Sequence, residues 1–307
     1  MSVTLEVLHV PGCPNLAPML ARLRQLTDLP VATREISTAS EAAAAGMSGS
    51  PTLLVNGVDV FANRGPAGSG VACRIYRDEQ GTAVPVPSVA QLRQVLASAE
   101  LTAWRDRARP QHPAEQAVHR AILRAFADTG RPPTPSDLAP VTQGSGRTTT
   151  EILAALHDLD AIRLDPRGHI AVAYPFSATP TRHRVWIGDG AVVYAMCAID
   201  ALGIAAMLGG HTRIESVDAA TGQPIAVTMT AGRTSWSPTG AVVFLTAEAG
   251  NGPSATCCCD DVNFFADTAT ARRWVTAHQG LAGQILTQAD AEDLGTRLFG
   301  TLLRSAW

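Results

Sequence analysis

The stretch VVYAMCAIDALGIAAMLGG, residues 192–210, decides the fold of the C-terminal part of the chain. Its start, 192–195, is β-branched and aromatic, which is typical of a strand, and Gly188-Asp189-Gly190 predicts a turn that pairs it with a preceding strand. Residues 196–208 are rich in Ala, Leu and Met and predict a helix, which Gly209-Gly210 ends. A strand that runs directly into an apolar helix is therefore the centre of the predicted core.

Further strands and helices follow this unit in the sequence. Apolar runs predict strands at 211–217, 224–230, 241–247 and 262–265, and helical patterns predict helices at 269–278 and 289–303. We expect the strands at 211–217, 224–230 and 241–247 to form a small mixed sheet, so that this region has an α+β fold.

Cys197 and Asp200 stand three positions apart at the start of the predicted helix, so both project from one face. The helix dipole at that end favours a thiolate, which is a soft ligand that selects soft metals. The Asp200 carboxylate is able to take a thiol proton and deliver it elsewhere. The pair predicts a reactive thiol site; the alternative is a packing cysteine beside a solvated carboxylate.

A run of three cysteines, Cys257 to Cys259, lies far from Cys197 in the sequence. One of the three completes a two-thiolate pocket if the fold brings it back to Cys197. The run lacks the paired Cys-x-x-Cys or Cys/His spacing of a structural zinc site, so we expect no such site.

The first 100 residues resemble the thioredoxin fold. Apolar periodicity predicts strands at 3–10, 31–36, 51–55 and 71–76, and helices at 15–29, 41–47 and 89–99. Cys13 falls at the turn after the first strand, where thioredoxins carry their redox cysteines, and Ser50-Pro51-Thr52 resembles their cis-proline loop. No second cysteine follows Cys13 to complete a Cys-x-x-Cys motif. Cys13 is therefore either structural or a thiol that binds or passes on a soft metal.

Residues 113–180 show a winged-helix pattern. Helices are predicted at 113–129, 135–138 and 148–159, and a hairpin at 161–173. DNA binding would need positive charge on the last helix, whereas 148–159 contains no Arg or Lys and carries Glu151 and Asp158. We therefore interpret this segment as a structural cover.

The composition of the 307 residues fits about two domains. Hydrophobic residues make up 46%, which excludes a wholly disordered chain, and the net charge of −3 argues against a protein that coats nucleic acid or an anionic membrane. No signal peptide is evident, and no apolar run approaches the ~20 residues of a membrane span. We expect a cytoplasmic protein with reduced thiols and without nucleic-acid or membrane partners.

Residues from about 113 to the C-terminus resemble the alkylmercury (organomercurial) lyase family, most closely over 183–300. The resemblance is carried by motifs in a fixed order, which are RAFADTG (124–130), VYAMCAIDAL (193–202), DAATGQPI (218–225), CDDVNFF (259–265) and AHQGL (277–281). Several ordered motifs in one chain are far more specific than any one of them.

The family pattern places its first catalytic cysteine on Cys197, its aspartate on Asp200 and its second catalytic cysteine on Cys259, with Cys258 as the alternative. The resemblance implies protonolysis of a carbon–mercury bond, in which Cys197 and Cys259 bind mercury as substrate and product and Asp200 protonates the carbon. It implies no organic cofactor, and external thiols release the product. A further structural cysteine of some members corresponds to Asp218, and we expect this difference to affect stability more than chemistry.

The predicted architecture is α+β with four segments. They are a thioredoxin-like domain (1–100), a linker (101–112), a winged-helix-like segment (113–180) and a lyase core (181–307). The implied partners are organomercury compounds, cellular thiols and a mercuric reductase. Two competing hypotheses remain: a non-catalytic carrier of mercury or copper that also uses Cys13, and a metal-responsive regulator, which the acidic helix disfavours.

Overall fold

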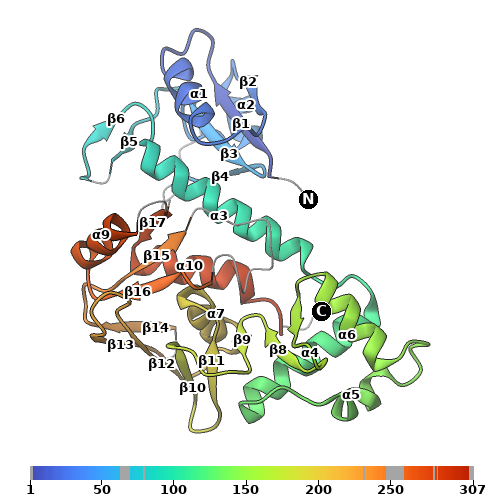
Figure 1. Cartoon of the computed structure of the whole chain (residues 1–307). Coiled ribbons are helices and arrows are strands. Elements are labelled where there is room, and N and C mark those ends of the chain that lie inside the picture. The colour runs from blue at the N-terminus through green and yellow to red at the C-terminus, as the bar shows by residue number, and fades with distance from the viewer. Residues whose placement is uncertain are drawn as a thin grey trace. The chain divides into compact units, whose positions relative to one another are not determined.

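The computed structural model describes residues 3–62, 70–78, 80–230, 232–246, 259–278, 281 and 283–303. The chain divides into two compact units, Met1–Ala103 and Trp104–Trp307, each built of helices and sheets (Figure 1). The overall class is therefore mixed α and β, as predicted. Within the described residues, no helix has the length and hydropathy that a membrane span requires.

The first unit contains a four-stranded sheet with the order β2-β1-β3-β4. Its strands are β1 (Leu5–His9), β2 (Val31–Glu35), β3 (Thr52–Val55) and β4 (Val58–Asp59), and α1 (Leu16–Arg24) and α2 (Ala39–Ala45) connect the first three. β1 pairs with β2 in parallel and with β3 antiparallel, because α1 carries the chain back between β1 and β2. The Ser50–Pro51 peptide bond is cis.

The strand predicted at 71–76 is wrong over most of its length. The structure has only the short β5 (Tyr76–Arg77), paired with β6 (Ala83–Val84). Before Tyr76 the backbone makes one isolated parallel bridge, between Cys73 and Ser50. The side chain of Arg74 is buried and forms an ion pair of 2.8 Å with Asp59, and it donates to the carbonyl of Phe61. The segment is thus held by a single bridge and by side-chain contacts rather than by a continuous ladder.

The segment predicted as a linker, 101–112, is largely helical. α3 (Val89–Arg107) continues through it, because Leu, Ala and Arg are strong helix formers and the first proline comes only at Pro110. Ala103 and Arg105 are buried, so this part of the helix has a packed face. The charged residues of the segment had suggested a solvated connection.

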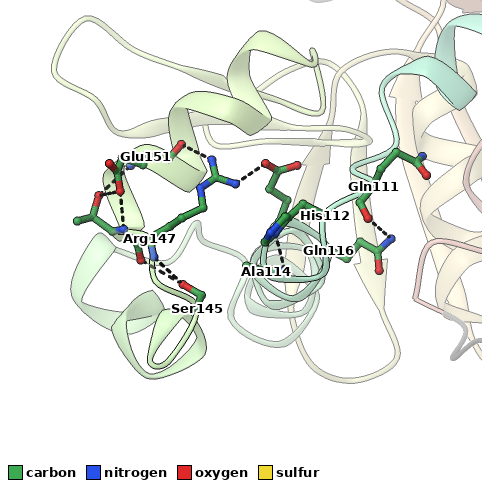
Figure 2. Close-up of polar contacts among 9 residues, drawn as sticks. Gln111, His112, Ala114, Gln116, Ser145, Arg147 and Glu151 are labelled. Atoms are coloured by element: carbon green, nitrogen blue, oxygen red, sulfur yellow. Dashed lines mark hydrogen bonds and ion pairs between the residues drawn. The ribbon is translucent and has the colours of Figure 1, made fainter.

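Three helices follow at the positions predicted from the sequence. They are α4 (Pro113–Thr129), α5 (Pro135–Thr142) and α6 (Thr149–Asp158). The start of α6 is held by a capping box between Thr148 and Glu151. Arg147 donates to the carbonyl of Glu151 (Figure 2). Arg147 also forms an ion pair of 2.6 Å with Glu115 of α4. Arg147, which directly precedes the cap of α6, is thus engaged within the protein.

The second unit is built around an eight-stranded sheet with the order β14-β13-β12-β10-β11-β9-β8-β7. Its strands along the chain are β7 (Ile162–Leu164), β8 (Ile170–Ala173), β9 (Phe176–Ser177), β10 (Arg184–Ile187), β11 (Val192–Ala195), β12 (Thr212–Val217), β13 (Pro224–Thr230) and β14 (Arg233–Ser237). Every pairing in this sheet is antiparallel.

The expected small mixed sheet is therefore wrong in size and in type. Tight turns join neighbouring strands, such as the one at Gly188-Asp189-Gly190, and short turns give antiparallel pairs. The hairpin β7–β8, which was predicted as part of a separate segment, belongs to the same sheet as the strands of the predicted core. β14 had not been predicted, because its sequence RTSWS is mostly polar.

In the described part of the unit, a second sheet and three further helices follow. The sheet has the order β16-β15-β17 and is antiparallel, with β15 (Val242–Thr246), β16 (Asn263–Phe265) and β17 (Gly283–Leu286). The helices are α7 (Ala198–Leu208), α9 (Thr268–Ala277) and α10 (Gln288–Phe299). α7 is buried almost throughout and packs along α10 (Figure 1). It contacts strands of both sheets and is the central element of the core.

Candidate active site

Cys197 is the residue at which β11 turns into α7. It is the N-cap of the helix in an extended conformation, with φ of −150°. Its Sγ accepts a hydrogen bond of 3.4 Å from the backbone N–H of Asp200, one of the N–H groups that the first turn of a helix leaves unpaired. The cysteine thus takes the place that serine, threonine or aspartate usually fills, and its sulfur is fixed beside Asp200.

Cys259 reaches the same place from the other sheet. The N–H of Ala198 donates 3.0 Å to the carbonyl of Val262, so the start of α7 is tied to the segment that leads into β16. The side-chain amide of Asn263 donates 2.7 Å to the carbonyl of Asp260 and closes the turn after Cys259. These backbone contacts bring together cysteines that are remote in the sequence.

Cys197, Asp200 and Cys259 form one cluster. Their sulfur and carboxylate oxygen atoms all lie within 4.8 Å of one another. The Cys259 thiol donates to Oδ2 of Asp200 over 3.9 Å. The three side chains are 5%, 4% and 7% exposed respectively, so their chemistry takes place almost without solvent. Of the three cysteines at 257–259, Cys257 and the alternative Cys258 lie outside the described residues.

The burial of the cluster sets its protonation. Removal from solvent raises the pKa of Asp200 to about 7, although the contact with Cys197 and the charge of Arg105 act in the opposite direction. Burial also raises the pKa of Cys197 to about 11. The expectation that the helix dipole makes Cys197 a thiolate is therefore wrong for the empty site, because desolvation outweighs the hydrogen bond from the helix.

This arrangement combines two functions in one place. Two adjacent sulfurs suit a soft, two-coordinate metal, and a carboxyl group that titrates near neutrality is able both to accept and to release a proton. A thiol that meets a soft metal must first lose its proton, and the carboxylate that receives it lies in contact. The cluster is thus suited to metal binding coupled to proton transfer.

Two other residues that the sequence analysis singled out, Cys13 and Asp218, lie outside the cluster. Cys13 is half-buried, belongs to the first unit and follows β1, whereas the cluster belongs to the second unit. Asp218 is buried, with one carboxylate oxygen accepting from the N–H groups of Ala220 and Thr221 and the other from Ala266 over 2.7 Å. Asp218 therefore ties the turn after β12 to the end of β16.

Sequence reasoning missed Arg105, which is fully buried and acts electrostatically on Asp200. It falls in the segment that was predicted to be a linker, where an arginine is ordinarily solvated. The helix-forming residues that continue α3 to Arg107 could have indicated a packed helix here, and such a helix has a buried face.

Comparison with known proteins gives a consistent result. The family model for MerB, alkylmercury lyase, matches residues 176–300, which include all three residues of the cluster. The alkylmercury lyase of Bacillus cereus is 32% identical over 185 residues, which are 60% of this chain and 81% of that protein. The chain belongs to the alkylmercury lyase family.

Other members of the alkylmercury lyase family agree with this assignment. The enzyme of Streptomyces lividans is 32% identical over 60% of this chain and 82% of its own length. A crystal structure of the mercury-bound form of MerB2 superposes with a TM-score of 0.57 and 26% identity, and covers 66% of this chain and 98% of that one. This family member therefore carries the lyase fold together with additional sequence.

Proposed function

We propose that this chain is an organomercurial lyase, which cleaves the carbon–mercury bond by protonolysis and converts R–Hg⁺ and a proton into R–H and Hg²⁺. The observation that carries the proposal is the cluster of Cys197, Asp200 and Cys259, whose ligand atoms lie within 4.8 Å of one another. Family membership assigns the same chemistry to the same region of the chain.

The first step is exchange of a thiol. The organomercurial arrives bound to a cellular thiol, and one cysteine of the cluster replaces that thiol, which leaves with the proton of the cysteine. Either cysteine is suited to this step, because both side chains contact Asp200. The mercury is then held by one protein sulfur and still carries its organic group.

The second step moves a proton and forms another mercury–sulfur bond. The remaining thiol gives its proton to the Asp200 carboxylate, and its sulfur donates to the mercury. Extra electron density from the second thiolate weakens the carbon–mercury bond. Asp200 then protonates the carbon, the electron pair of that bond forms the new carbon–hydrogen bond, and the hydrocarbon leaves. A general acid of this kind contributes typically about 10²–10⁴ in rate.

After cleavage, Hg²⁺ stays on the two sulfurs and Asp200 is again ionised. External cellular thiols remove the metal, and a mercuric reductase is the proposed consumer of the product. The scheme uses only the three side chains and external thiols, without an organic cofactor. A cytoplasmic location fits such thiols.

The direct experiment follows benzene released from phenylmercury in the presence of excess thiol. We expect Cys197→Ser and Cys259→Ser each to abolish turnover, whereas Cys73→Ser, at an exposed cysteine of the first unit, serves as the matched control. Cys257→Ser should retain activity, and its loss would move the second sulfur within the cysteine run. Absence of hydrocarbon with folded wild-type protein would remove the lyase assignment.

The carrier hypothesis is separated from the lyase by Asp200. A protein that only binds mercury or copper keeps its metal affinity in Asp200→Asn and has no turnover to lose. A lyase keeps two sulfurs for Hg²⁺ in this variant and loses proton delivery to carbon. Equilibrium binding of Hg²⁺ should be retained in Asp200→Asn under both hypotheses and shows that the variant is folded. Hydrocarbon release by the wild type, and its loss in Asp200→Asn, are expected only for a lyase.

For the rest of the chain, we propose a thioredoxin-like domain at 1–100 and a winged-helix-like cover at 113–180. The order of strands and helices in the first unit supports the former, and the helices α4 to α6 followed by a hairpin support the latter. The acidic face of α6 and the internal ion pair of Arg147 favour a structural role for the cover over DNA binding. Cys13→Ser, assayed for Hg²⁺ release with limiting thiol, tests whether Cys13 passes the metal on.

A further inference from the structure

Arg105 is a fully buried cation without a local partner. Its side chain has no exposed surface, and none of its three guanidinium nitrogens has a hydrogen-bond partner among the described residues. Burial lowers its pKa to about 10, so the group remains charged at neutral pH. An uncompensated buried charge is costly, which means that a charge elsewhere in the unit must offset it.

Aromatic rings hold the guanidinium in place. Its central carbon lies 5.8 Å from the ring centre of Trp104 and 5.2 Å from that of Phe299, at the end of α10. The Phe299 ring in turn lies against Gly203 of α7, where an added Cβ would stand 2.2 Å from Cδ2 of the ring. Gly203 follows Asp200 by three positions on the helix, so the two share a face.

Asp200 is the strongest source of attraction for this cation. The carboxylate of Asp200 acts on Arg105 more than Tyr174 or Asp160 does, and the neighbouring Arg109 opposes these attractions. Burial lowers the pKa of His119 in α4 to about 3, and the charge of Arg105 acts in the same direction. This imidazole is therefore neutral and does not offset the charge of Arg105. Arg105 and Asp200 are thus the charges that balance each other in this part of the core.

The proposed reaction keeps one negative charge in the cluster throughout. Two thiols and an ionised Asp200 carry a charge of minus one. When R–Hg⁺ has replaced one thiol proton and the second proton has moved to Asp200, the charge of minus one lies on the mercury and its two sulfurs. After the hydrocarbon leaves, the mercury dithiolate is neutral and Asp200 is ionised again. A fixed cation nearby therefore stabilises the cluster before, during and after cleavage.

We propose that Arg105 is the counter-cation of the Cys197–Asp200–Cys259 cluster, a positioning residue that acts through Asp200 and stabilises the buried negative charge as it moves from the carboxylate to the mercury–sulfur complex. This role deepens the proposed lyase function and rests on it for its catalytic part. The pairing of the two charges is a property of the folded protein that needs no mercury.

The test combines Arg105→Met, Arg105→Lys, Asp200→Asn and the double variant Arg105→Met/Asp200→Asn in the full chain. Denaturant unfolding without mercury measures the pairing. Each neutralising single variant leaves one buried charge unbalanced. The loss of midpoint in the double variant should therefore be smaller than the sum of the losses in the two single variants. The exposed Arg107 of the same helix supplies the control, and the effects of Arg107→Met and Asp200→Asn should add.

Turnover of phenylmercury measures the catalytic part. We expect Arg105→Met to lower kcat by about 10- to 100-fold with a smaller change in KM, because the cation is needed most when the negative charge has moved to the mercury and its two sulfurs. Arg105→Lys, which keeps the positive charge, should recover much of the lost kcat. A purely structural arginine would not show rescue by charge.

The outcomes are separable. Strictly additive midpoints, or an Arg105→Met enzyme with unchanged kcat, would overturn the proposal. If Arg105→Met does not fold, the double variant must fold for the proposal to stand, and an equally unfolded double variant overturns it. Failure of the lyase function itself appears in the wild-type protein as absence of benzene, whereas the midpoints report the charge pairing regardless of turnover.

Discussion

The thiol of Cys259 points at Oδ2 of Asp200 over 3.9 Å, and neither side chain is more than 7% exposed. The acid therefore lies in contact with one of the two thiols from which it is proposed to take a proton. The same burial that makes the contact possible raises the pKa of Asp200 to about 7. The position of the carboxylate and its proton affinity thus have one structural cause.

The rate of cleavage should depend on pH through Asp200. The carboxylate must be ionised to accept a thiol proton, so kcat/KM for phenylmercury should rise with pH and level off above about pH 7, near the pKa that burial confers. A profile from pH 5 to 9 with external thiol in excess measures this limb. A limb near pH 4, the range of an ordinary aspartate, would contradict the account.

Asp218 should contribute to stability rather than to turnover. Asp218→Ala removes an acceptor for three backbone N–H groups, two of them in the turn at 220–221 and one at Ala266. We expect a loss of roughly 2–4 kcal/mol in the free energy of unfolding, measured by denaturant titration. Activity per folded molecule should stay within a few-fold of wild type, and a selective loss of kcat would show that the turn shapes the active site directly.

Gly203→Ala tests the contact between α7 and α10. The added methyl group would stand 2.2 Å from Cδ2 of Phe299, so the ring must move. Overpacking of this kind costs about 1–3 kcal/mol, which a thermal or denaturant transition detects. Gly190→Ala is the matched control, because its nearest contact would be an ordinary 3.5 Å to the Ile187 carbonyl. Equal stability of the two variants would mean that the helix pair is loosely packed.

His119 should make the protein less stable in mild acid. Burial lowers the pKa of His119 to about 3 in the folded state, whereas the unfolded chain titrates near the ordinary 6.5. The unfolded state therefore binds more protons below pH 6.5, and the stability contributed by neutral His119 is lost as the pH falls, by up to about 1.4 kcal/mol per pH unit.

The measurement compares unfolding free energies of the wild type and His119→Gln between pH 6.5 and 5. The substitution should reduce the slope by up to that amount, and an unchanged slope would show that the imidazole is protonated in the folded protein.

Two residues of the cluster could be predicted from local spacing, because Cys197 and Asp200 lie on one helical turn. Cys259 was predicted from the resemblance to the lyase family, whose pattern places the second cysteine just before the VNFF strand. Their approach to within 4.8 Å depends on the hydrogen bond between Ala198 and Val262, which is a long-range contact that no local pattern contains.

Other features could not be predicted, because they depend on opposing effects or on long-range contacts that only the folded structure reveals. The dipole of α7 predicts a thiolate at Cys197, but only the three-dimensional burial shows that desolvation wins. The eight-stranded antiparallel sheet depends on pairings between β9, β11 and the hairpin β7–β8 that join two segments treated as separate in the sequence. Arg105 could not be identified because charged residues in a polar stretch are ordinarily solvated.

The sulfur of Cys197 is held by the main-chain N–H of residue 200, while the proposed proton delivery depends on the carboxylate of the same residue. Every amino acid except proline offers that N–H, so a change of side chain at this position leaves the metal-binding sulfur in its place. A descendant of this protein is therefore able to lose its acid in a single mutation and still sequester mercury. Conversion of such an enzyme into a scavenger, or the reverse, needs no rebuilding of the scaffold.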